Sequence, residues 1–202
     1  MDSWLPARIN QTTSQYYEAI GLLGSTYVDI QSFMHLIAAA CISERNLNAN
    51  KRAIPFVIRL GAVSLDKSIR DSAKIRYSEN PEIVSEFDFI CDLAESARIA
   101  RNAYLHSNIP INPDPVSPVK FASAPDNKAP SGRSFSADIA ELQELCKNVL
   151  HIRNYCGAAA LWSLYPKKQE IELNINGNIK VLKFSSLEKP SPAICPTWVH
   201  SN

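Results

Sequence analysis

Residues 81 to 106, PEIVSEFDFICDLAESARIARNAYLH, predict one long helix around which the rest of the chain can be arranged. Asn80 is a favoured N-cap residue, Pro81 suits the first helical position, and Glu82 places an acid near the positive end of the helix dipole. At 1.5 Å per residue this helix would be about 39 Å long. Apolar residues recur on one of its faces, which we expect to lie in the core: Ile83, Ile90, Leu93, Ala97 and Tyr104.

Two further stretches, residues 12–43 and 136–165, show the same helical periodicity. Apolar side chains recur in both at spacings of three and four, which indicates one buried face on each helix. Ser136 is the expected N-cap of the second stretch. The apolar pattern of residues 136–165 is the cleanest in the chain, so this helix must pack against the others.

Between the first two helices, residues 54–77 predict a further helical region. Pro55 is expected in its first turn, where a missing N–H costs nothing, and Gly61 is expected at a kink. The asparagine-rich residues 44–50 before it are expected to form a loop.

Near the C-terminus, residues 170–183 predict a β-hairpin around an Asn-Gly pair. A three-residue loop would pair Leu173 with Val181 and keep the apolar residues on one face, so we expect that register. The predicted fold class is therefore all-α, a bundle of about four long helices with a small C-terminal β-hairpin.

A proline-rich segment interrupts this helical pattern, with six prolines between residues 110 and 133. Proline blocks both helix and interior strand, so we expect an irregular insertion, which is either a lid over the neighbouring motif or a disordered segment. Residues 1–165 would form the bundle that contains this insertion. Residues 166–202 would form the hairpin and an irregular tail packed on the bundle.

The amino-acid composition narrows the classes of function that the protein can have. The 202 residues include 46% hydrophobic residues, enough for a sizeable core, and 21 basic against 20 acidic residues give a net charge of +1. This near-balance argues against a broadly basic surface, so any RNA binding must use a local patch. Five cysteines without a C-x-x-C pair indicate reduced core packing, and no apolar run is long enough for a membrane span. We expect a soluble, cytoplasmic protein without a metal or other cofactor.

The helix over residues 81–106 ends in the motif Arg101-Asn102-Ala103-Tyr104-Leu105-His106. Metal-independent RNA cleavage needs a base for the 2′-hydroxyl proton, an acid for the leaving oxygen and fixed positive charge on the phosphate. His106 can act as base or acid, and the fork of Arg101 can clamp the phosphate. Asn102 shares a helix face with His106 at i, i+4 and is expected to orient its ring by a hydrogen bond.

One histidine and one arginine supply only half of this catalytic set, so the chemistry is expected to need a homodimer. A half-apolar strip beside the core stripe is the candidate dimer surface, and it consists of Phe87, Cys91, Ala94, Arg98, Asn102 and Leu105.

The pattern of Arg101, Asn102 and His106 at a helix end resembles the motif of the HEPN superfamily, the higher eukaryotes and prokaryotes nucleotide-binding domains. The resemblance implies a dimerising helical bundle that often acts as a metal-independent endoribonuclease, frequently in toxin or antiviral systems with an antitoxin partner. It covers roughly residues 12 to 165 in architecture and six residues in sequence. Two other interpretations stay open: a non-catalytic dimer that binds RNA, a nucleotide or a protein, and a helical scaffold with a chance motif.

Several neighbouring residues are secondary candidates. Arg98 is either a second phosphate contact or the i, i+3 partner of Glu95, and Ser107 and Asn108 either bind substrate or turn the chain. His35 is either a second imidazole for the site or a structural histidine. Four basic residues either contact the RNA backbone or lie on a solvated helix face: Lys67, Arg70, Lys74 and Arg76.

Overall fold

A computed structural model describes residues 11–43, 47–108, 118–123, 133–166, 170–175 and 178–200. These residues form five α-helices, two small β-sheets and one short 3₁₀ helix. The helices are α1 (Gln11–Ile42), α2 (Leu47–Val57), α3 (Ala62–Arg76), α4 (Pro81–Leu105) and α5 (Ile139–Trp162). The described chain is thus mostly helical with small β elements, as the sequence predicts.

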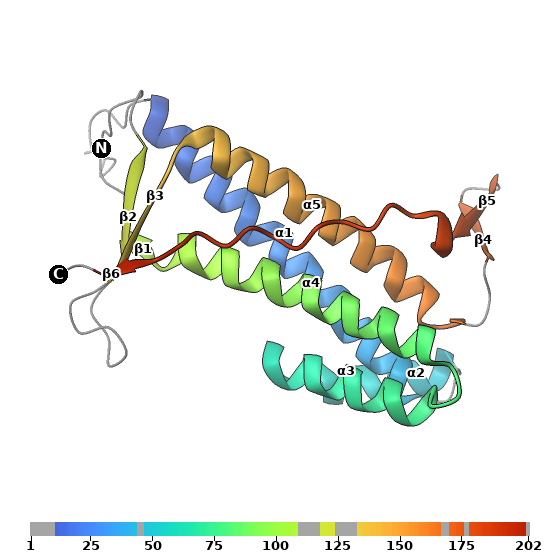
Figure 1. The fold of residues 1–202 in the computed structure, drawn as a ribbon. Coiled ribbons are helices and arrows are strands. Elements are labelled where there is room, and N and C mark those ends of the chain that lie inside the picture. The colour runs from blue at the N-terminus through green and yellow to red at the C-terminus, as the bar shows by residue number, and fades with distance from the viewer. Residues whose placement is uncertain are drawn as a thin grey trace, which may run out of the picture.

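Three long helices, α1, α4 and α5, run along the length of the molecule, and α2 and α3 pack on them at one end (Figure 1). α1 contacts each of the other four helices, and its largest interface is with α5. The predicted apolar face of α1 is buried over its whole length, from Tyr16 through Leu23 and Ile30 to Cys41. Burial of this continuous stripe is the main source of stability for such a bundle.

The region between α1 and α4 differs from the prediction, because two helices replace one kinked helix and residues 47–50 are helical. Pro55 lies near the end of α2 rather than in its first turn. A proline cannot donate to the carbonyl one turn earlier, and α2 ends two residues later at Val57. Gly61, in an extended conformation, then starts α3 by accepting a 2.9 Å hydrogen bond from the N–H of Leu65. The good helix formers Ala49, Lys51, Arg52 and Ala53 outweigh Asn48 and Asn50.

We expected Ser136 to cap the N-terminus of α5, but the N-cap residue is Asp138. The Asp138 carboxylate accepts from the N–H of Glu141 at 2.8 Å, and the Glu141 carboxylate accepts from the N–H of Asp138 at 2.9 Å. This reciprocal capping box satisfies two backbone donors at once. Ser136 is unavailable because it belongs to a strand.

The larger sheet is antiparallel and has the strand order β1-β2-β3-β6. Its strands are β1 (Ser107–Asn108), β2 (Val119–Ser123), β3 (Arg133–Ala137) and β6 (Val199–His200). The prediction of an irregular segment over residues 110–133 is therefore wrong for β2 and for the first residue of β3. The physical reason is that the prolines lie outside the strands, so alternating apolar residues such as Val119 and Phe121 can face the core. The predicted lid falls on residues 109–117 and 124–132, which lie outside the described residues.

The predicted hairpin is present as β4 (Glu170–Ile175) and β5 (Asn178–Lys183), but in a different register. Ile175 pairs with Asn178, and Leu173 pairs with Lys180 rather than with Val181. This is the register of a two-residue connection, which the Asn-Gly pair favours. Turn preference thus outweighs the matching of apolar residues on one face.

After the hairpin, the 3₁₀ helix η1 (Phe184–Ser186) leads into an extended tail that runs back along α4 to β6 (Figure 1). Two polar contacts hold the tail: Lys189 pairs with Glu86 at 2.5 Å, and the N–H of Ala193 donates to Ser96 Oγ at 2.9 Å. The tail after η1 therefore packs along α4. No helix in the described part of the chain has the length and apolar character needed to cross a membrane.

Four of the five cysteines are buried, and Cys195 is exposed. All five carry free thiols, as the spacing predicts. Burial raises the pKa of the Cys41 and Cys156 thiols to about 12. These two thiols therefore remain protonated at neutral pH and act as core packing.

Candidate nucleic-acid site

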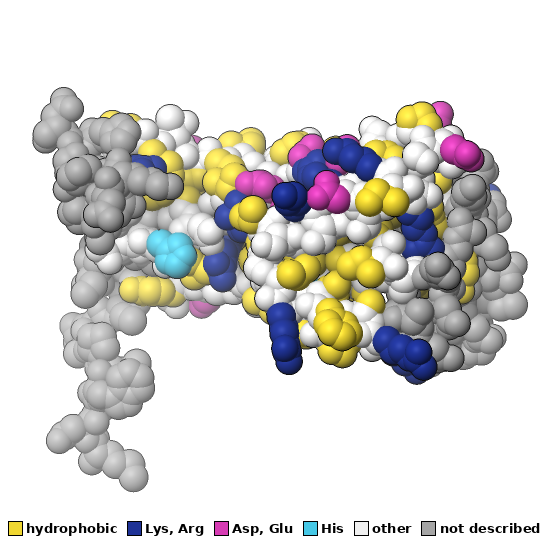
Figure 2. All heavy atoms as spheres, turned by 90° about the horizontal axis from the view of Figure 1, so that it is seen from below, with side chains coloured by type: hydrophobic (Ala, Val, Ile, Leu, Met, Phe, Trp, Pro, Cys, Tyr) yellow, Lys and Arg dark blue, Asp and Glu magenta, His cyan; other side chains and the backbone are white. Residues whose placement is uncertain are grey.

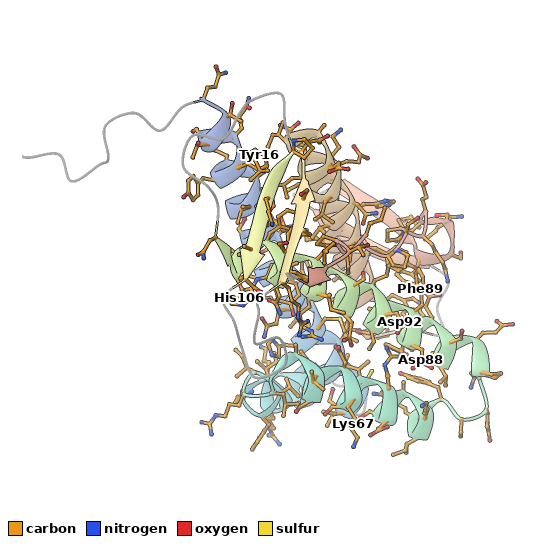
Figure 3. The ribbon with its side chains drawn as sticks, turned by 60° about the vertical axis from the view of Figure 1, so that its left-hand side comes forward. Tyr16, Lys67, Asp88, Phe89, Asp92 and His106 are labelled. Atoms are coloured by element: carbon orange, nitrogen blue, oxygen red, sulfur yellow. The ribbon has the colours of Figure 1, made fainter. Side chains whose placement is uncertain are left out.

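The motif lies at the C-terminal end of α4, where the helix meets β1 (Figure 3). His106 is the C-cap residue, and its backbone N–H donates to the carbonyl of Asn102 at 3.1 Å. Its side chain is exposed at the surface. A rigid helix end thus presents an open imidazole to solvent.

Arg101 lies half-buried against α1 rather than free in solvent. Its guanidinium carbon lies 5.2 Å from the ring centroid of Tyr27, a cation–π contact, and its Nη1 donates to Asn102 Oδ1 at 2.6 Å. Its Nε is buried and has no hydrogen-bond partner within the described part of the chain. One face of the guanidinium is therefore fixed, and one of its donors is unsatisfied.

Asn102 does not play the role that we expected. Its side-chain oxygen accepts from Arg101, and no hydrogen bond joins it to the ring of His106 among the described residues. A charged guanidinium makes the stronger hydrogen bond, so the amide is drawn to its neighbour in sequence. In this single chain Asn102 orients Arg101 and leaves the ring of His106 without that support.

The secondary candidates also have partners within the chain. Arg98 pairs with Glu95 at 2.7 Å, the i, i+3 arrangement that the sequence left open. The hydroxyl of Ser107 donates to the carbonyl of Ala103 at 2.5 Å, while Asn108 is exposed in β1. Of these three residues, Asn108 alone keeps an exposed side chain beside His106.

The aromatic residues of the sheet hold the motif helix in place. The ring of Tyr104 lies 5.0 Å from that of Phe121 and 5.1 Å from that of Phe135, both edge-on. Phe135 also contacts Trp198 at 4.9 Å, which ties the C-terminal tail to the same cluster. Burial raises the pKa of the Tyr104 phenol far above its usual range, so Tyr104 is a core residue, as its spacing predicts. Sequence reasoning missed this support, although the alternating pattern around Phe121 was a usable signal.

The dimer strip that we expected on α4 is largely buried within the chain itself. Phe87 and Cys91 have exposed fractions of 0% and Ala94 of 5%, and the Cys91 thiol lies 3.9 Å from the carbonyl oxygen of Asp66 in α3. The prediction was wrong because a helical pattern shows which face is half-apolar but not that α3 covers it. At the motif end of the strip, Leu105 remains 39% exposed.

A buried acid that the sequence did not single out lies between α3 and α4. Asp66 is only 9% exposed, and no hydrogen bond to its carboxylate is present among the described residues. Burial is the main cause that raises its pKa to about 6, the charge of nearby Glu95 raises it further, and Arg70 and Arg98 oppose the rise. Asp66 also lines a small cavity of about 10 Å³ together with Tyr27. Asp66 is thus a carboxyl with a raised pKa, and its charge interacts with that of Arg98, one turn before the motif.

The basic residues of α3 do not form a free patch. Arg70 bonds Asp88 at 3.0 Å and Asp92 at 2.6 Å, and Arg76 donates to backbone carbonyls at the end of α1. Figure 2 shows basic and acidic side chains side by side on this face. Lys67 and Lys74 remain exposed, so the solvated-face interpretation fits the structure better.

His35 does not supply the second imidazole of the site. Leu105 packs against α1 at Gly24, where its Cδ1 lies 3.6 Å from the position that a Cβ on Gly24 would take. His35 is eleven residues further along α1, which is about 16 Å at 1.5 Å per residue. Its Nε2 is buried without a partner among the described residues. Among the side chains that the structure describes, His106 is therefore the imidazole that the motif end of one chain presents.

Two sizeable grooves, of about 660 and 480 Å³, lie elsewhere on the molecule, and neither is lined by Arg101, Asn102 or His106. Within the described residues, no group of three or more His, Cys, Asp or Glu side chains is placed to hold a metal ion. Neither groove therefore belongs to the motif. Comparisons with protein-family models, with curated proteins and with solved structures found no match for this chain.

Proposed function

We propose that this protein is a metal-independent endoribonuclease that acts as a homodimer, with a composite site built from Arg101 and His106 of both copies. The observation that carries the proposal is the exposed imidazole of His106 at a helix end, five residues after Arg101, whose guanidinium is oriented by Asn102. The resemblance of Arg101, Asn102 and His106 to the HEPN motif supports the same reaction. A role as a toxin or antiviral ribonuclease, restrained by an antitoxin protein, belongs to this proposal.

The reaction follows from the side chains present. One imidazole removes the proton from a ribose 2′-hydroxyl, whose oxygen attacks the adjacent phosphorus. The imidazolium of the second copy gives a proton to the departing 5′ oxygen, so the proton balance closes. Arg101 stabilises the charge that develops on the phosphorane oxygens. The products are a 2′,3′-cyclic phosphate and a 5′-hydroxyl end.

The second copy must meet the outer face of α4, because the inner strip is buried. Ile99 is 42% exposed, and at helical spacing it shares a face with Asn102 and His106. Leu105, 39% exposed, borders the same face. A two-fold contact centred on this face would bring both imidazoles into one cleft, because an isologous interface uses the same patch of both copies.

A second candidate function is a dimer that binds RNA or a nucleotide without cutting it. It is favoured by the contacts of the two arginines, because Arg101 is engaged by Asn102 and Arg98 by Glu95. A phosphate can replace the neutral amide of Asn102 with little loss, but it must displace a carboxylate to reach Arg98. In this case the motif serves as an anchor for phosphate rather than as a catalyst.

Cleavage of a mixed RNA pool in EDTA, followed by end-group analysis, tests the proposal. Wild type should produce cyclic-phosphate ends, and His106→Ala and Arg101→Ala should not. His151→Ala, a half-buried histidine on α5, is the matched control and should retain activity. Equal cleavage by all four proteins would refute the proposal. RNA binding without cleavage by wild type, lost in Arg101→Ala, would support the second candidate instead.

Mixing experiments test whether the site is composite. If both imidazoles are required, an equal, fully exchanged mixture of wild type and His106→Ala retains about a quarter of the wild-type activity, against about half for independent sites. Activity that falls in direct proportion to the wild-type fraction would place a complete site in each chain.

A further inference from the structure

An apolar groove of about 480 Å³ lies where the C-terminal parts of α1 and α5 meet α2, at the end of the molecule opposite His106 (Figure 1). Its walls are large apolar side chains from all three helices: Phe33, Leu36, Ile54, Leu161 and Leu164. Leu36 and Leu161 are 44% and 39% exposed. The volume falls within the range of small-molecule sites, about 300 to 1,000 Å³.

The floor of the groove explains why it is hollow. It consists of Ala39 from α1 with Gly157 and Ala160 from α5, so small residues lie between the large walls. A Cβ on Gly157 would lie 3.2 Å from the ring of Phe33, which shows that the missing side chain lets this ring lie against α5. The groove is therefore set by the size of its residues along two tightly packed helices.

The charge that lines the groove is positive. Lys51 is the single charged residue that lines it, and it is exposed at the rim. Arg52 and Arg59 are exposed on the same helix and the turn after it, and no acidic residue occurs from 47 to 65. An apolar groove with an ammonium at its rim is complementary to an amphiphile with an anionic head.

We propose that this groove binds a long-chain fatty acid, with its hydrocarbon chain between α1, α2 and α5 and its carboxylate at Lys51. The methylenes remove the apolar walls from water, which supplies the affinity, and the ammonium of Lys51 fixes the direction of the chain. This site does not depend on the proposed ribonuclease function, because its residues lie apart from the motif.

Isothermal titration calorimetry of the full chain with octanoate, dodecanoate and hexadecanoate, each below its aggregation concentration, tests the proposal. Affinity should rise by about fourfold for each added methylene until the groove is filled. Dodecanol should bind about two- to fivefold more weakly than dodecanoate, because it lacks the ion pair with Lys51. Lys51→Ala should remove this difference, while the control Lys67→Ala, an exposed lysine on α3, should keep it.

Two exposed leucines on α5, one that lines the groove and one that does not, test which surface binds the fatty acid. Leu161→Gln should weaken dodecanoate binding by about tenfold. Leu150→Gln, which is 43% exposed on the same helix but away from the groove, should bind like wild type. Circular dichroism of both variants verifies that they are folded.

Three outcomes would overturn the proposal. Affinity independent of chain length would show that the hydrocarbon chain does not enter the groove, and equal losses in the two glutamine variants would place binding elsewhere. Absence of fatty-acid binding, together with a wild-type dimer that Leu161→Gln dissociates in sedimentation analysis, would assign the groove to a second copy of the chain.

Discussion

Replacing the buried acid Asp66 by asparagine should make the protein more stable at neutral pH. The folded chain raises the pKa of Asp66 from its ordinary value of 3.8 to about 6. Between these two pH values the folded chain holds a proton that the unfolded chain has released, so the free energy of unfolding falls as the pH rises. Above about pH 6 the Asp66 carboxyl is ionised in both the folded and the unfolded chain, and the loss of stability that its buried charge causes is constant. The rise of about two in the pKa of Asp66 corresponds to a loss of about 3 kcal/mol in the free energy of unfolding.

The substitution Asp66→Asn removes this cost, because the amide has nearly the shape of the protonated acid and carries no charge. Urea denaturation from about pH 4 to about pH 8 should show a variant that is about 3 kcal/mol more stable than wild type at pH 7. The difference should shrink toward zero near pH 4. Other carboxyls titrate in both proteins and cancel in this comparison.

A matched control is Asp71→Asn, since Asp71 is an exposed acid on the same helix. It should change the free energy of unfolding by less than about 0.5 kcal/mol at every pH. If Asp66→Asn were less stable than wild type at pH 7, or if its effect were the same at every pH, the carboxylate would be stabilised by its neighbours, and the reasoning would be refuted.

Three further predictions concern packing, capping and thiol access. Phe121→Ala removes a ring that stacks 4.9 Å from Phe135, and it should lower the free energy of unfolding by about 3 to 5 kcal/mol in urea denaturation. Asp138→Ala should cost about 1 kcal/mol through loss of the N-cap, whereas Ser136→Ala, at the cap position that the sequence suggested, should be nearly neutral; thermal unfolding of the two variants separates these cases. Cys195 should be the one thiol that a water-soluble disulfide reagent modifies quickly in the native protein, since the other four are buried, and mass spectrometry counts the adducts.

The long helices were predictable because each carries an uninterrupted period of three and four. All of the apolar positions expected in α1 are buried, and α4 begins at Pro81 as its N-cap signal indicates. Residues 44–77 were harder, since Pro55 suits a first turn locally but occupies a late one. Local preference is a weak prior there, and packing against α1 decides the outcome.

The strands beside the motif were missed for a different reason. Proline content suggested an irregular segment, but the composition of a segment does not show where within it the prolines stand. Phe121 and Phe135 lie in the proline-free pieces and pair with each other across β2 and β3. The burial of the α4 strip was equally invisible, because one sequence pattern does not show whether a helix of the same chain or a second copy covers an apolar face.

The position of the motif was predictable from sequence, but the partners of its arginines were not. Arg98 pairs with a carboxylate, whereas Arg101 pairs with a neutral amide, and both keep a buried Nε without a partner among the described residues. A phosphate that approaches Arg101 replaces one neutral acceptor, so its charge-assisted hydrogen bonds are gained at little cost. At Arg98 the same phosphate would leave Glu95 unpaired beside the buried Asp66, whose charge already opposes that of Glu95. The electrostatics of the single chain therefore favour Arg101 as the phosphate contact and assign Arg98 to the internal ion-pair network.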